Sequence, residues 1–266
     1  MRHCLALLAL LLSPRLSAAQ LHLELGATQR QWSSAELLSH PQAQTIRIEQ
    51  DVAYNRPMQY RAVPLAALLP GVSASDHVQA VALDGFAAEM PAAPLLQKGP
   101  AQAWLAVEDP NQPWPPLGAG KPGAGPFYLV WTAAQAGGIR PEQWPFQIAT
   151  LRQLAPVAQR YPALLPDPTL PADSPVRQGF ALFQQNCMAC HRLNGAGDAQ
   201  VGPDLNVPHN PTEYFQPGYL RTLIRNPQNL RQWPQAKMPG FAESVLSDKE
   251  LDALLGYLQH MAKRKP

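Results

Sequence analysis

Three residues in the C-terminal third of the chain have the types and the spacing that could do chemistry. Cys187 and Cys190 are separated by two residues, and His191 follows directly, in the run Cys187-Met188-Ala189-Cys190-His191. Two thiols at this spacing can each add to one vinyl group of a haem, and the adjacent imidazole can then bind the iron. The pattern predicts one covalent haem c, attached through Cys187 and Cys190, with His191 as an axial ligand.

Three other interpretations of the cysteine pair are weaker. A zinc site needs two further soft ligands, and the chain has no second cysteine pair. A thioredoxin-like redox pair does not need the following histidine and lies beside a βαβ pattern that is absent from this sequence. A disulfide across two residues is strained. Covalent haem is therefore the favoured prediction.

A second axial ligand is expected downstream. Met238 lies in Lys237-Met238-Pro239-Gly240, where Pro and Gly fix the backbone of a loop, and a thioether ligand raises the reduction potential. Met188 lies inside the attachment motif and cannot reach the opposite face of the haem, and Met261 lies close to the chain end. His209 remains the alternative and would give a lower potential. Met238 is the predicted iron ligand.

The sequence around the motif predicts helices. Ser174 followed by Pro175 is typical of a helix start, and Phe180 and Phe183 then follow at helical spacing. A second helix is expected over 219–225. The capping box of Ser247 and Glu250 predicts a last helix. Residues 174–266 are therefore expected to form an all-α domain.

Residues 174–262 resemble the class I cytochrome c fold. Gly179 and Phe183 stand where the first helix of that family crosses the last, here near Gly256-Tyr257. Gly202-Pro203-Asp204-Leu205 is similar to the family segment whose proline carbonyl accepts a hydrogen bond from the proximal histidine. The resemblance implies that Pro203 orients His191. Either Arg231 or Trp233 could contact a haem propionate, although ordinary packing explains both equally well.

The N-terminal part has the alternating pattern of strands and short helices near 33–36 and 64–69, so residues 20–155 are expected to form a mainly β, α+β domain. The expected strands are 21–25, 45–49, 78–83, 86–90, 102–108, 127–132 and 146–151.

This N-terminal part resembles the sulfite-oxidase-type molybdopterin domain more loosely. The resemblance rests on Arg61-Ala62-Val63-Pro64-Leu65, on the Asp84-Gly85-Phe86 hairpin, and on the run from Gly125 to Trp131. In that family a cysteine thiolate binds molybdenum, and no cysteine lies between Gln20 and Pro171. We therefore expect neither molybdopterin nor molybdenum catalysis.

The first residues are typical of a secretory signal peptide. Arg2 and His3 precede an apolar run at 5–12, and small residues precede an expected cleavage after Ala19. Cleavage removes two arginines and no acid, so the formal charge falls from +2 to 0. We expect a periplasmic protein with no membrane span after cleavage, and no binding of nucleic acid. Six prolines from Pro156 to Pro175 predict an extended linker over 156–173.

Together these features predict a periplasmic electron-transfer cytochrome that shuttles single electrons between redox proteins. We expect an electron carrier rather than a catalytic enzyme, with the N-terminal domain as a docking or scaffold unit. One alternative is a fused oxidoreductase whose N-terminal domain binds a substrate or molybdopterin. Another is a small-ligand sensor, which would need an open iron position.

Overall fold

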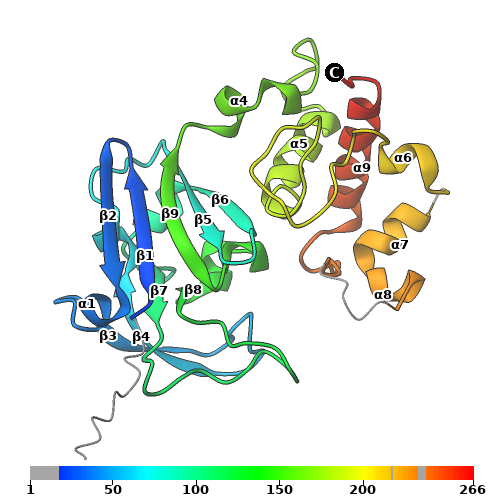
Figure 1. The fold of residues 1–266 in the computed structure, drawn as a ribbon. Coiled ribbons are helices and arrows are strands. Elements are labelled where there is room, and N and C mark those ends of the chain that lie inside the picture. The colour runs from blue at the N-terminus through cyan, green and yellow to red at the C-terminus, as the bar shows by residue number, and fades with distance from the viewer. Residues whose placement is uncertain (1–17, 217, 233–237) are drawn as a thin grey trace, which may run out of the picture.

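The computed structural model describes residues 18–216, 218–232 and 238–266. It has a sheet-rich N-terminal part and a helical C-terminal part, which lie side by side (Figure 1). Nearly all of the expected signal peptide, and Trp233, lie outside the described residues. Within the described ranges no helix is both long enough and apolar enough to cross a membrane.

The first sheet of the N-terminal part has five strands. In spatial order they are β2 (Thr28–Ser33), β1 (Gln20–Leu25), β9 (Ile148–Leu154), β5 (His77–Ala82) and β6 (Ala87–Pro91). β1 and β9 run parallel, and the other neighbouring strands run antiparallel. On β1 the alternate leucines Leu21, Leu23 and Leu25 are buried, because successive side chains of a strand point to opposite faces. This side of the sheet faces the N-terminal core.

The second sheet has four antiparallel strands. Their order is β3 (Gln44–Ile48), β4 (Met58–Pro64), β7 (Ala103–Val107) and β8 (Phe127–Trp131). Every residue of β7 and β8 is buried, which explains their continuous apolar sequences. One hydrophobic cluster contains side chains from both sheets. The mainly β prediction is confirmed, whereas the sulfite-oxidase likeness stays a prediction.

Short helical turns join these strands. They are α1 (Ser34–Leu38), α2 (Leu65–Leu68), α3 (Ala92–Leu96) and the 3₁₀ turns η1 (Ala134–Gly137) and η2 (Pro141–Gln143). The capping box predicted at Ser33 is present: its hydroxyl accepts from the Glu36 N–H, and the Glu36 carboxylate accepts from the Ser33 N–H.

The proline-rich segment differs from the extended linker that we expected. It contains α4 (Val157–Arg160) and η3 (Pro162–Leu164). Val157 and Leu164 are buried in the C-terminal hydrophobic cluster, and the Tyr257 hydroxyl donates to the Leu164 carbonyl at 2.7 Å. The first half of this segment is thus packed against the helical part, because its apolar side chains find a core there.

The C-terminal part is helical, as predicted. Its helices are α5 (Pro175–Asn186), α6 (Pro211–Tyr214), α7 (Tyr219–Arg225), α8 (Pro227–Leu230) and α9 (Asp248–Ala262). The Ser174 hydroxyl caps α5, with Pro175 at the first helical position, and Ser247 with Glu250 forms the capping box of α9. These caps start the two long helices where the sequence predicted.

α5 and α9 cross in close contact. A Cβ built on Gly179 would lie 2.0 Å from the Ala253 carbonyl oxygen and 2.6 Å from the Tyr257 Cβ. Phe183 and Tyr257 are fully buried beside this point, with ring centroids 5.6 Å apart. The predicted crossing is present, and Gly179 is the glycine that permits it. A Cβ on Gly256 meets nothing within 4 Å.

Polar contacts fix the two parts of the chain to each other. The Ala87 N–H of β6 donates to the Ala189 carbonyl at 3.0 Å, inside the attachment motif. Arg160 binds both Glu89 of β6 and Asp198. Because Arg160 and Glu89 are largely buried, these are interface contacts rather than solvated surface pairs.

We predict that Gly179→Ala destabilises the protein by about 1–3 kcal/mol, because the new methyl group overlaps backbone atoms of α9 that cannot move independently. Denaturant unfolding of the holoprotein measures this difference. Gly256→Ala is the matched control in the partner helix and should be neutral or stabilising by up to about 1 kcal/mol. Equal effects of the two substitutions would contradict the close approach at Gly179.

Candidate functional site

The attachment motif forms a turn at the C-terminal end of α5. The Cys187 N–H still donates to the Phe183 carbonyl at 2.9 Å, as in the helix. The next turn closes back on the same residue, because the N–H groups of Cys190 and His191 donate to the Cys187 carbonyl at 3.0 and 2.8 Å. This turn therefore gathers the two thiols and the imidazole that the sequence predicted would act together.

Burial affects both kinds of side chain in the motif. It raises the pKa of the Cys187 thiol to about 12, with a smaller contribution from the negative charge of Glu142. Burial also lowers the pKa of His191, against the opposing effect of its hydrogen bond with the Pro203 carbonyl. A neutral imidazole is the form that binds iron, so this environment suits a ligand.

The ring of His191 is held by the segment that follows the motif. Its Nδ1 lies 2.8 Å from the Pro203 carbonyl oxygen, which makes Nδ1 the protonated nitrogen and leaves Nε2 for a metal. The Gly202 N–H donates to the Cys190 carbonyl at 2.7 Å. A Cβ on Gly202 would lie 2.6 Å from the imidazole Cε1. The structure thus contains the contact that the resemblance implied for Pro203.

Asp204 holds the loop that carries Pro203. Its carboxylate accepts four backbone N–H groups at 2.7–3.2 Å, from Asn194, Gly195, Asn206 and Val207. Sequence reasoning missed this role, although an aspartate in a segment with Gly, Pro and Asn is a turn signal.

Two buried asparagines join the same loop to α9. Asn206 donates to the Met261 carbonyl at 2.7 Å, and Asn210 donates to the Leu258 carbonyl at 3.0 Å. Both side chains are fully buried, so these bonds form away from water. Sequence reasoning missed them because their partners lie about 50 residues away.

Met238 is half-buried and packs against the C-terminal hydrophobic cluster, as Cys187 does. The chain after it is anchored to α7, since the Phe241 N–H donates to the Ile224 carbonyl at 2.9 Å and Arg225 donates to the Phe241 carbonyl at 2.9 Å. Lys237 and the four residues before it lie outside the described residues.

The alternative ligands occupy different surroundings. Met188 and Met261 are buried in the hydrophobic core, at 4% and 1% exposure. His209 is exposed. Among the described residues, no group of three or more His, Cys, Asp and Glu side chains is placed to hold a metal ion. The half-buried position of Met238 therefore favours it over these alternatives as the second ligand. The assignment remains a prediction.

These residues fit a covalent haem. Two thiols and a neutral, oriented imidazole lie on one turn, and a methionine from a separate loop packs against the same apolar cluster. Residues 176–262 match the family model described as Cytochrome c. This match indicates a cytochrome c domain with covalently bound haem c and supports haem-based electron transfer. A search of curated proteins found no match to the chain.

We predict that Gly202→Ala lowers the stability of the holoprotein by about 1–3 kcal/mol, because its methyl group would push against an imidazole that is bound to the Pro203 carbonyl. The haem absorption spectrum should also shift as the ring tilts. Gly99→Ala is the control, since a Cβ there meets nothing within 4 Å. Unchanged unfolding and unchanged spectra in Gly202→Ala would show that this contact does not orient His191.

Proposed function

We propose that this chain is an exported electron carrier with one haem c, attached through Cys187 and Cys190 and bound axially by His191 and Met238. The observation that carries the proposal is the attachment turn with His191 Nδ1 2.8 Å from the Pro203 carbonyl. A structural cysteine pair would have no need of an oriented imidazole beside it.

The haem supplies reversible one-electron chemistry when bound. Cys187 and Cys190 hold it to α5, and His191 offers Nε2 because its Nδ1 proton is committed to Pro203. Met238 offers a thioether, which stabilises the reduced state and raises the potential. The apolar side chains around Cys187 exclude water, so little solvent must reorganise when the charge changes.

Export and partners are part of the proposal. The apolar run before the small residues at 17–19 supports a cleaved leader and a periplasmic location. We propose that the partners are other redox proteins, bound transiently through small interfaces.

We propose that residues 20–155 form a separate domain that supports the cytochrome domain at 174–266 rather than catalysing a reaction of its own. Two observations favour this role. The N-terminal domain lacks a cysteine to bind molybdenum, and its β6 donates a hydrogen bond to Ala189 within the attachment motif.

Met238→Ala should retain covalent haem but lose the methionine–iron charge-transfer band, lower the potential and bind carbon monoxide. Visible spectroscopy and redox titration of the purified holoprotein measure these changes. Met261→Leu, a volume-conserving substitution in the core, is the control and should keep the band. An unchanged spectrum in Met238→Ala would rule out this ligand, and His209→Leu would then test the alternative. Rapid carbon monoxide binding by the unaltered protein would favour a sensor.

Metal analysis of the purified holoprotein should give one iron per chain and no molybdenum, since the N-terminal domain offers no thiolate for molybdenum. A pyridine haemochrome spectrum on the same sample should show that the iron is in haem c. Stoichiometric molybdenum would support a fused oxidoreductase instead of a carrier.

A further inference from the structure

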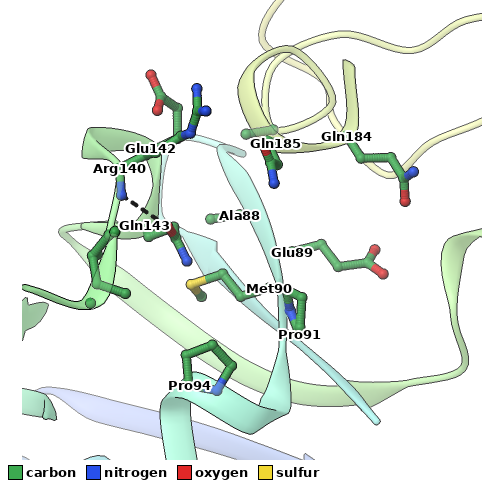
Figure 2. Close-up of a pocket in the computed structure, with 14 residues that line it drawn as sticks. Ala88, Glu89, Met90, Pro91, Pro94, Arg140, Glu142, Gln143, Gln184 and Gln185 are labelled. Atoms are coloured by element: carbon green, nitrogen blue, oxygen red, sulfur yellow. Dashed lines mark hydrogen bonds between the residues drawn. The ribbon is translucent and has the colours of Figure 1, made fainter. Parts of the chain in front are cut away.

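A cavity of about 210 Å³ lies between the two parts of the chain. β6 lines one side with Ala88 and Met90, and the end of α5 lines another with Gln184 and Gln185 (Figure 2). Glu142, from η2, belongs to the same lining. Gln184, Gln185 and Ala189 flank Cys187 in sequence, so the cavity lies beside the point of haem attachment.

Glu142 places a carboxyl group in this interface whose charge is only partly compensated. Its Oε2 atom is buried and has no hydrogen-bond partner among the described residues. Burial raises the pKa of this carboxyl, and a hydrogen bond with its own backbone and the charge of Arg140 only partly oppose the shift. A buried carboxylate without a partner is costly unless it is protonated or a positive charge lies near.

The charged groups around the cavity are committed to other partners. Arg140 donates to the Val245 carbonyl at 2.6 Å and to Glu250 at 2.8 Å. Glu89 of β6 is paired with His77 and Arg160. Gln184 and Gln185 are uncharged. No element around the cavity therefore supplies a dedicated cation to Glu142 among the described residues.

Glu142 lies close enough to Cys187 for its negative charge to contribute, after burial, to the raised pKa of that thiol. A haem joined to that sulphur therefore comes within the electrostatic range of the carboxylate. Oxidation of the iron adds one positive charge to the haem, and a nearby positive charge favours the ionised carboxylate. This charge would add to the partial compensation that Arg140 provides.

We infer that Glu142 links a proton to the redox state of the haem: it releases a proton when the iron is oxidised and takes one up when the iron is reduced. The inference rests on the proposed function. On oxidation the electron passes to the redox partner, the iron changes from ferrous to ferric, and the O–H bond of Glu142 breaks with its proton passing to water. Reduction reverses each step.

Thermodynamic linkage between proton binding at Glu142 and reduction of the iron determines how the potential changes with pH. Glu142 would have a lower pKa with ferric iron than with ferrous iron. Between these two pKa values, the reduction potential of the haem falls as the pH rises. Since burial raises the pKa of Glu142, this pH interval extends above the ordinary glutamate pKa of about 4.3. Below both pKa values the carboxyl is neutral and has no effect on the potential.

The test is the potential of the holoprotein between about pH 4 and pH 8 in the wild type, Glu142→Gln and Glu24→Gln. At the high-pH end of this range, Glu142→Gln should have a higher reduction potential than the wild type. Its potential should also change less with pH, because the ionisation of Glu142 is removed. A threefold change in proton affinity between redox states corresponds to about 28 mV for one electron. Glu24 is exposed on β1, so Glu24→Gln removes an equal charge and should follow the wild type.

Parallel profiles for the wild type and Glu142→Gln would overturn the inference. Infrared difference spectra of the wild type provide a second measurement that needs no variant: a protonated carboxyl band should appear on reduction and vanish on oxidation. Absence of this band would also overturn the inference. A pyridine haemochrome spectrum comes first, because failure to find haem c would instead defeat the proposed function.

Discussion

The haem-binding part depends on the contact between α5 and α9 at Gly179. The backbone of α5 approaches the Ala253 carbonyl so closely that any side chain at Gly179 would overlap it. α5 ends in the cysteine motif, so this contact sets where the motif lies. α9 also accepts hydrogen bonds from Asn206 and Asn210, which belong to the loop that orients His191. Thus one helix crossing positions both the cysteine motif and the loop that holds the His191 ring.

Local patterns predicted the features that depend on neighbouring residues. The caps at Ser33, Ser174 and Ser247 are present because each uses N–H groups only two or three residues away. Strands with alternating or fully apolar sequences were also predictable. β2 and β4 were missed: β2 is exposed or half-buried throughout, so it has no buried face to produce alternation. β4 adds two adjacent buried residues, Ala62 and Val63, which interrupt the period of two.

Features that depend on distant partners were not predictable. The prolines of 156–173 predicted an extended chain, yet Val157 and Leu164 fold onto a core whose other members lie far along the sequence. Arg160 likewise gives no local sign of its pairing with Glu89 and Asp198. At the candidate site, the spacing within the attachment motif is enough to predict the haem-binding roles of Cys187, Cys190 and His191. The contact of Pro203 came from the family resemblance, and the role of Asp204 required the folded loop.

The buried and half-buried carboxylates of this protein differ in how their charge is compensated. Asp51 is 2% exposed and accepts from the hydroxyl groups of Tyr60 and Tyr128. Asp198 is bound by Tyr161, Gln79 and Arg160, and these bonds lower its pKa although burial opposes them. Burial of such charges costs several kcal/mol unless hydrogen bonds or opposite charges compensate for it. The Oε2 atom of Glu142 has no hydrogen-bond donor among the described residues, and the charge of this carboxylate contributes to the raised pKa of the Cys187 thiol. A positive charge on the haem would therefore compensate the Glu142 carboxylate, which the surrounding side chains compensate only in part.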